Sequence, residues 1–326
     1  ILAVIRDRYD GPIYDLRSRG YNVSVTPDHT MLIRKKGALV KRYAKDSLEH
    51  YVNVPTHAEG WNGYSFSDRI TFEPWFHEDV LIWFRPDPPL RNMDNLPSAF
   101  VPTRMSNQDR RRVYVAPYWD LDCNIEDLKG EIWFSDGKWR VKVPFFWNTD
   151  LFLELAGWFV AEGSSNHYYN KVDDFDSWKI IITQSDLGDI ARIADDLGLT
   201  YGRSTQKNAN DLSVSSRVLY SAFREMFGEK AKEKRIPGFI LKMETSRLHK
   251  IYNTLMAGDG PFCRGTYYST SSDQLKDDFI ELALKLGYSI SARQWDERVW
   301  HIYLSHGAGM VAPKLNTSIR EYSGPV

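Results

Sequence analysis

The stretch LELAGWFVAEG, residues 153–163, combines a long apolar run with small residues and ends on a carboxylate followed by glycine. Its pattern predicts a buried helix over residues 149–161. Gly157 and Ala161 lie four positions apart and therefore on one face of that helix. Small residues at this spacing let a second helix approach closely. Glu162 then stands just past the predicted contact, where a buried helix seldom ends on a charge without a partner.

A second stretch of the same kind, IYNTLMAGDGPF, covers residues 251–262. Each copy is followed by the same expected order of two strands, an amphipathic helix and two further strands. The amphipathic helices are predicted over residues 186–199 and 273–288, and they end alike in LGLTYGR and LGYSISAR. This repetition indicates an internal duplication. We therefore predict an α+β protein with two pseudo-symmetric αββαββ units, over residues 148–230 and 231–314.

The second copy has Thr254 and Gly258 at the positions of the small residues, followed by Asp259. If the two helices pack together, Glu162 and Asp259 lie side by side at neighbouring helix C-termini, where both dipoles are negative and cations are favoured. Such oxygen ligands select Mg²⁺ or a similar ion. Taken singly, an Asp-Gly pair is most often a turn. At equivalent positions of a duplicated unit, the two carboxylates favour a metal site.

Two nine-residue stretches, LAGWFVAEG (155–163) and YNTLMAGDG (252–260), resemble the two signature motifs of LAGLIDADG homing endonucleases. The first has Glu162 where the family usually has aspartate, and the second keeps the closing Gly-Asp-Gly. Between them, KRIPGFIL (234–241) resembles the lysine-containing block that precedes the second motif in intein-type members. The resemblance covers the chain from about residue 148 onward.

The resemblance implies a site-specific endonuclease that makes a double-strand break in DNA at a long recognition site, as a monomer with internal pseudo-two-fold symmetry. Glu162 and Asp259 would each hold a divalent metal, with two or more ions in total and Mg²⁺ the expected one. The backbone carbonyls of Ala161 and Gly258 would help to hold them. Metals placed in this way would activate water and stabilise the attacking and leaving oxygens of the phosphodiester.

Two further residues receive catalytic roles from the resemblance. Lys234 is the candidate for the basic group that stabilises transition-state charge, and the alternative is a solvated lysine in the charged run KEKR. Gln184 stands at the end of a predicted strand, where the family often has a polar residue that organises water. The alternative for Gln184 is a strand-end cap.

The predicted strands suggest a surface for DNA. By the resemblance, each four-stranded sheet would lie across the major groove. Residues that alternate along a strand share one side, and arginine and tyrosine contact phosphates or base edges. The candidates for DNA contact are Tyr201, Arg203 and Thr205 in the first unit and Arg264, Tyr268 and Arg293 in the second.

The N-terminal region carries another resemblance. Residues 9–32, YDGPIYDLRSRGYNVSVTPDHTML, look like the block of intein splicing domains that contains a TxxH motif, here with Thr26 and His29. In that family the threonine and histidine polarise a peptide bond for an acyl shift. Taken alone, His29 would more often be a hydrogen-bonded core or turn histidine than a catalyst.

The C-terminal YSGPV, residues 322–326, looks like the start of the block that precedes an intein's closing His-Asn. We therefore expect residues 1–60, with 315–326, to form a β-rich, partial Hint-like splicing domain. The chain opens on Ile1 and has no closing His-Asn, so splicing by this chain as written is not expected.

Residues 61–147 are rich in aromatic residues and proline and match no motif. We expect an accessory region there. The basic runs RRR (110–112) and KWRVK (138–142) slightly favour contact with DNA over a role in covering the joint between domains.

The whole composition excludes some classes of protein. Of the 326 residues, 42% are hydrophobic and 26% charged, and no stretch approaches the ~20 apolar residues of a membrane span. The two cysteines lie far apart and outside any CxxC pattern, which argues against a disulfide framework or structural zinc. Net charge of −1 argues weakly against nucleic acid. A cytoplasmic protein, encoded by a prokaryote or phage, is expected.

Two alternatives to the endonuclease remain open from the sequence. One is an RNA-splicing maturase or a DNA-binding regulator on the same fold. The other is a self-splicing intein whose terminal residues are missing from this sequence.

Overall fold

The computed structural model describes residues 8–18, 21–35, 38–46, 61–89, 96–103, 113–137, 140–171, 175–205, 209–260, 267–296, 298–305 and 316–325. The chain divides into two compact units. One runs from Gly63 to Asp259, and the other combines Ile1–Asn62 with Gly260–Val326. This division runs through the second predicted repeat, because the first helix of that repeat belongs to one unit and its strands to the other.

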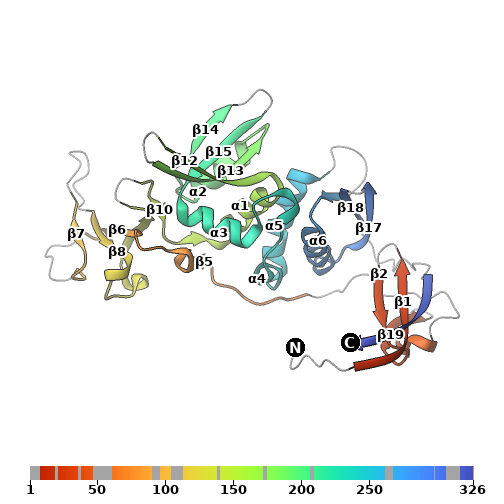
Figure 1. Ribbon diagram of the computed structural model, residues 1–326. Helices are drawn as coiled ribbons and strands as arrows, with labels where there is room; N and C mark the ends of the chain where they lie inside the picture. The colour runs from red at the N-terminus through yellow and green to blue at the C-terminus, as the bar shows by residue number, and fades with distance from the viewer. Residues whose placement is uncertain are drawn as a thin grey trace. The chain divides into compact units, whose positions relative to one another are not determined.

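The first repeat is a four-stranded antiparallel sheet with helices against one face (Figure 1). The strands are ordered β12-β13-β15-β14. Ile180 and Ile182 of β13 and Leu212 and Val214 of β15 are buried on the same face, so this face packs on the helices. The elements are α1 (Thr149–Glu162), β12 (Gly163–Asn170), β13 (Phe175–Gln184), α2 (Gly188–Asp196), β14 (Gly202–Thr205), β15 (Asn210–Ser215) and α3 (Arg217–Phe227).

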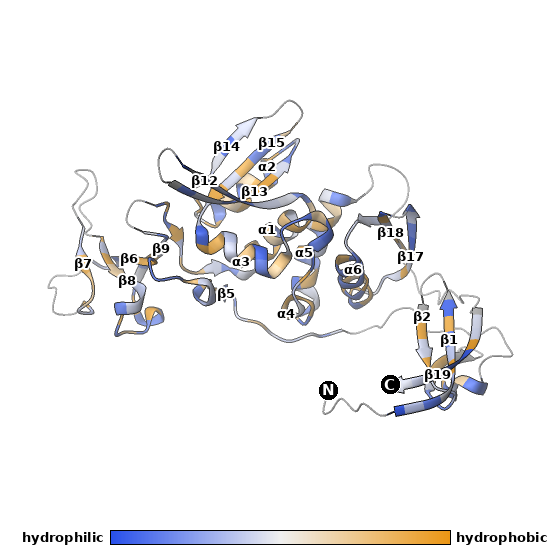
Figure 2. Ribbon diagram, viewed as in Figure 1, coloured by the Kyte–Doolittle hydropathy of each residue, from blue (hydrophilic) through white to orange (hydrophobic). Residues whose placement is uncertain are grey.

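Helix α1 begins where the sequence predicts. The side-chain oxygen of Asn148 accepts the N–H of Leu151 at 3.1 Å, which satisfies one of the free donors of the first turn. The helix is apolar along most of its length, whereas the neighbouring β12 is predominantly polar (Figure 2). It packs against α5 (Thr245–Asp259).

Helix α3 was not among the predicted elements. It begins after Ser216, whose hydroxyl accepts the N–H of Leu219 at 3.3 Å. Its buried residues include Leu219, Phe223 and Phe227, which recur every four positions and face the sheet and α1. The first repeat is therefore αββαββα, and the expected αββαββ order was one helix short.

The second repeat has a three-stranded antiparallel sheet within the described residues. Its order, β16-β18-β17, matches the order β13-β15-β14 of the first repeat. The strand expected before β16 falls in residues 261–266, outside the described residues. The elements are α4 (Gly238–Leu241), α5, β16 (Tyr267–Thr270), α6 (Asp273–Lys285), β17 (Ser289–Asp296) and β18 (Val299–Ser305). None of the helices that the structure describes is long and apolar enough to cross a membrane.

The accessory region is β-rich, with a five-stranded sheet ordered β10-β9-β6-β8-β7. An aromatic cluster joins it to the first repeat, because the ring of Phe72 contacts those of Trp147, Phe152 and Phe223. The elements are β5 (Arg69–Ile70), η2 (Glu73–Trp75), β6 (Leu81–Pro86), β7 (Val101–Pro102), β8 (Tyr114–Pro117), η4 (Tyr118–Asp120), η5 (Ile125–Asp127), β9 (Gly130–Ser135), β10 (Val143–Pro144) and β11 (Trp147–Asn148).

The two ends of the chain share one sheet, in which β1 pairs with both β2 and β19. Asp15 accepts a hydrogen bond from Arg320 at 3.0 Å across this pairing. The small core of this part contains Leu16, Val25, Met31, Ile33 and Ala44. The elements are β1 (Arg8–Ser18), β2 (Tyr21–Val25), β3 (Thr30–Lys35), β4 (Ala38–Tyr43), η1 (Ala44–Asp46) and β19 (Asn316–Pro325).

Candidate active site

The small residues of α1 and α5 meet in pairs. A Cβ placed on Gly157 would lie 1.9 Å from Oγ1 of Thr254, and a Cβ on Gly258 would lie 2.5 Å from Cβ of Ala161. No real side chain could occupy either space without moving the facing helix. The close approach of two helices that the sequence predicts from these four residues is therefore present in the structure.

This contact brings the C-terminal ends of the two helices together. The Cβ position of Gly258 lies 3.8 Å from Oε1 of Glu162, so the Glu162 carboxylate lies beside the last turn of α5. Asp259 is the next residue along that turn. Both carboxylates are partly exposed. Burial raises the pKa of Glu162, because few solvent molecules reach this side chain to stabilise its charge.

Lys234 is buried beside the same helix ends, with 4% of its surface exposed. Its Nζ donates a hydrogen bond to the carbonyl oxygen of Phe159 at 2.9 Å and lies 3.8 Å from the centre of the Phe159 ring. Burial lowers the pKa of Lys234 to about 7, and the charge of Asp259 acts in the opposite direction. The alternative of a solvated lysine is therefore wrong.

Gln184 connects the end of β13 to the carboxylate of Glu162. Its Nε2 donates to Oε1 of Glu162 at 3.4 Å, while its own Oε1 accepts the N–H of Ser185 at 2.8 Å. The bond with Ser185 fits the alternative of a strand-end cap. The same side chain also reaches the Glu162 carboxylate, and its role in organising water stays a prediction.

The donor set suits a hard divalent cation. Glu162 and Asp259 supply carboxylate oxygens, and Ala161 and Gly258 belong to last turns, in which some backbone carbonyls have no partner within the helix. Within the described part of the chain, no group of three or more histidine, cysteine, aspartate or glutamate side chains could hold a metal. An octahedral cation such as Mg²⁺, held by two carboxylates, would have further positions for water or phosphate oxygens.

The first sheet places three predicted DNA contacts on its helix side. Arg203 pairs with Leu212, which is buried against the helices, and residues paired across strands share a face. Thr205 has the same phase as Arg203, and the Tyr201 hydroxyl donates to Asp195 at 3.0 Å. The sequence predicts that Tyr201, Arg203 and Thr205 share one side, and in the structure they share the helix side of the sheet. Their contact with DNA stays a prediction. The outer face instead carries residues of the opposite phase: Asn166, Tyr168, Lys179, Thr183, Ser204 and Ser213.

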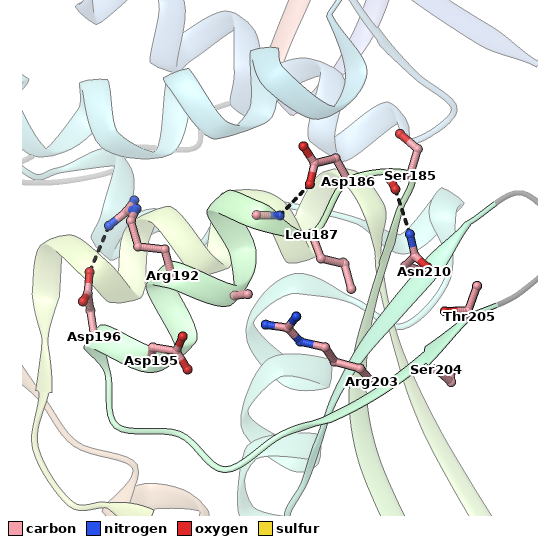
Figure 3. Close-up of a pocket in the computed structure, with 12 residues that line it drawn as sticks. Ser185, Asp186, Leu187, Arg192, Asp195, Asp196, Arg203, Ser204, Thr205 and Asn210 are labelled. Atoms are coloured by element: carbon pink, nitrogen blue, oxygen red, sulfur yellow. Dashed lines mark hydrogen bonds and ion pairs between the residues drawn. The ribbon is translucent and has the colours of Figure 1, made fainter.

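Arg203 points toward α2 and lines a cavity of about 680 Å³ (Figure 3). Arg192 of α2 lies at the same cavity, paired with Asp196 at 3.0 Å. None of the predicted catalytic residues lines it. This cavity is therefore separate from the site at the helix ends.

The second sheet changes one of the other three assignments. Tyr268 is fully buried, and its ring stacks on Phe279 of α6 with 4.0 Å between centroids, so it is a core residue and its prediction as a DNA contact is wrong. Arg293 is exposed and pairs with His301, on the face away from α6. Arg264 lies outside the described residues. The sequence does not single out Tyr267, Trp295, His301 and Tyr303, although the alternation in VWHIYLS signals the last two.

Thr26 and His29 lie in the turn between β2 and β3. The N–H of His29 donates to the carbonyl oxygen of Thr26 at 3.1 Å, and the N–H of Ala44 donates to the carbonyl oxygen of His29 at 2.9 Å. The His29 side chain is exposed. These contacts describe a turn and do not test a role in splicing.

No protein-family model matches the chain. Among curated proteins, it is similar to a DNA polymerase of Thermococcus sp. (strain GE8), with 23% identity over 373 aligned positions that cover 94% of this chain and 22% of the polymerase. A DNA polymerase of Thermococcus hydrothermalis is 24% identical over 169 positions, which cover 50% of this chain and 10% of that polymerase. The chain thus spans about a fifth of the length of the first relative.

Solved structures similar to this chain include homing endonucleases. I-DmoI in complex with DNA and Mn is 16% identical, with a TM-score of 0.40, and the match covers 48% of this chain and 90% of I-DmoI. I-WcaI bound to its DNA recognition sequence is 10% identical, with a TM-score of 0.32, covering 48% of this chain and 76% of I-WcaI. These TM-scores are too low to establish a common fold. The function proposed below therefore depends on the site itself.

Proposed function

We propose that the chain is a divalent-metal-dependent, site-specific DNA endonuclease that makes a double-strand break at a long recognition site. The observation that carries this proposal is the group of side chains at the ends of α1 and α5. Two carboxylates from different helices lie there beside a buried lysine. A buried lysine close to carboxylates is costly for stability and is common at sites of chemistry.

The chain's own residues have the following proposed roles. Glu162 and Asp259 would hold the cations, with Mg²⁺ the expected ion, and the phosphodiester and water would complete the ligands. A bound cation supplies an activated water and stabilises negative charge on the phosphate oxygens. Lys234 places a positive charge beside the reacting phosphate, and Gln184 orients Glu162 and a water molecule.

The protein is proposed to act as a monomer with two pseudo-symmetric halves. The equal strand orders β13-β15-β14 and β16-β18-β17 support this part of the proposal. Each sheet would contact the duplex through its outer face.

The ends of the chain are proposed to be the remnant of a Hint-like splicing domain. Pairing of β1 with β19 supports this, because an inserted element must bring its two ends together. Alignment of 94% of the chain with 22% of a DNA polymerase is also what an element inserted in a longer protein would give.

The test uses a supercoiled plasmid that carries the chain's own flanking coding sequences, rejoined without the insertion. Incubation with Mg²⁺ should give linear DNA, and EDTA should prevent it. The Glu162→Gln and Asp259→Asn variants should lose linearisation by at least about 100-fold, because each removes a metal ligand. Glu78→Gln, which changes an exposed acid in the accessory region, is the matched control and should cut like the parent. Equal cutting by all four proteins would contradict the assignment of the site.

A further inference from the structure

The face of the second sheet that points away from α6 carries an unusual concentration of rings. Tyr267 of β16 pairs with Tyr303 of β18, and Arg293 of β17 pairs with His301. The opposite phase contains the buried Tyr268, Ile302 and Leu304, which pack toward α6. Among the described strand residues, this outer face has one arginine, one histidine, two tyrosines and several serines. Its carboxylate, Asp296, pairs with Val299 at the end of the hairpin.

Three of these rings form a continuous stack. The His301 ring lies 4.9 Å from Tyr267 at an interplanar angle of 25° and 5.2 Å from Trp295 at 17°. Trp295 is the end member and is 72% exposed. A ring so exposed offers a large apolar area to a planar partner.

The strand register explains how Trp295 reaches this position. The pairing shifts between Gln294 and Asp296, so that Trp295 is an extra residue in β17. A bulge of this kind re-aims a side chain. Asp296 fixes the following turn, because its Oδ1 accepts the N–H groups of Arg298 at 2.7 Å and Val299 at 3.0 Å. The exposed ring is thus held by a built feature of the hairpin.

We propose that Trp295 is a stacking platform for one base of the recognition site, which leaves its normal stack in the duplex and continues the series Tyr267–His301–Trp295. Arg293, 5.8 Å from the Tyr303 ring, contacts a neighbouring phosphate. This inference rests on the proposed function and names one of its specificity-determining residues. The composition of the face selects the partner, because stacked rings beside an arginine suit a polyanion that carries planar bases. The Asp296 carboxylate accepts the N–H groups of its own turn.

Preorganisation strengthens the platform. Because His301 and Tyr267 already hold the Trp295 ring, little side-chain freedom is lost when a base stacks on it. Base stacking on an aromatic side chain contributes a factor of about 5 to 100 in affinity. Because only one base leaves its stack, loss of Trp295 should change affinity in a way that depends on one position of the DNA. Loss of a phosphate contact should weaken binding equally for all sequences.

The experiment is a double-mutant cycle, with one change in the protein and one in the DNA. It uses the full chain carrying Glu162→Gln, so that bound DNA stays uncut. Affinity is measured by fluorescence anisotropy for duplexes in which each nucleotide of the cleaved site is replaced in turn by an abasic analogue. At one position, abasic replacement should lower affinity by about 5- to 100-fold when Trp295 is present. In the Trp295→Ala protein, the same replacement should lower affinity almost no further. Trp295→Phe, which keeps a ring, should restore most of the effect. Trp119→Ala, which removes another exposed tryptophan, is the control and should leave the profile unchanged.

Additive losses at every position, or binding by Trp295→Ala within twofold of the parent, would overturn the inference while leaving the endonuclease intact. A single-stranded oligonucleotide of the same sequence is measured beside the duplex. If Trp295→Ala lowers affinity more for the single strand than for the duplex, the stack serves single strands and the inference is overturned as well. If the protein with native Glu162 fails to cut and no duplex is bound, the proposed function fails together with this inference.

Discussion

Gly258 lies so close to Ala161 that a Cβ on the glycine would be 2.5 Å from the alanine Cβ. The same Cβ would be 3.8 Å from Oε1 of Glu162. The contact that holds α1 against α5 therefore also sets the position of a candidate metal ligand. Packing and chemistry at this site depend on the same few atoms.

Replacement of Gly258 by alanine should lower DNA cleavage by at least about 10-fold, because the helix ends must separate. In an open helix the substitution would gain up to about 1 kcal/mol in stability, whereas overpacking here should cost about 1–3 kcal/mol. The double variant Ala161→Gly/Gly258→Ala exchanges the two side chains and should recover much of both losses. Urea unfolding and plasmid cleavage check this, and failure of the exchange to recover anything would argue against a direct contact.

Replacement of Lys234 by methionine should separate stability from activity. Burial is the main cause of the low pKa of Lys234, about 7, so the unfolded chain holds the proton more strongly between pH 7 and pH 10. Lysine therefore destabilises the parent fully below pH 7 and progressively less as pH rises toward 10. The melting temperature of Lys234→Met relative to the parent should accordingly increase as pH falls from 10 to 7, while cleavage is lost. Lys232→Met changes an exposed lysine nearby and should show neither effect.

The part of the site that is local in sequence could be predicted. Gly157, Ala161 and Glu162 stand within six residues of one another on a helix, and the duplication supplied their counterparts. The burial of Lys234 could not be predicted, because it depends on contact with Phe159, which is distant in sequence. Its surroundings in the chain, KEKR, indicate solvent.

The face of the sheet on which each strand residue lies could not be predicted from the sequence. Side chains alternate along a strand, so a shift of one residue exchanges the two faces. The sequence predicts that Tyr268 and Arg203 contact DNA, but pairing with Ile302 and Leu212 places them on the helix side of their sheets. Strand pairing is a long-range property, which the sequence of one strand does not contain. For α3 a signal was present, because Leu219, Phe223 and Phe227 have helical spacing.

Asp136 should stabilise the junction between the accessory sheet and α3 in a pH-dependent way. Its carboxylate accepts the N–H groups of Arg217 at 2.7 Å and Val218 at 3.0 Å and lies 3.2 Å from Nε2 of His77. Burial opposes ionisation, but these hydrogen bonds outweigh it and lower the pKa of Asp136 below its usual 3.8. Asp136→Asn should cost about 1–2 kcal/mol at pH 7.

Because the pKa of Asp136 is lower in the folded protein, its contribution is present above about pH 4 and is lost as pH falls through the folded value. The difference between parent and Asp136→Asn in urea unfolding should therefore shrink between pH 5 and pH 2.5. His77→Gln serves as a second variant, since it removes the imidazole contact and keeps the carboxylate. A difference that stays constant with pH would show that shape, and not charge, matters at this junction.

Arg247 should hold the segment before the accessory sheet against α5 and α1. Its buried guanidinium donates to the carbonyl oxygen of Phe66, to Asp68 and, at 3.3 Å, to Asp150. Arg247→Met keeps the apolar stem but removes these bonds, which should cost about 1.5–3 kcal/mol. The cost should stay below that of breaking a fully buried ion pair, because Asp68 and Asp150 remain accessible to water. Hydrogen exchange should show faster opening of residues 66–70, whereas an unchanged rate there would place the role of Arg247 within α5 alone.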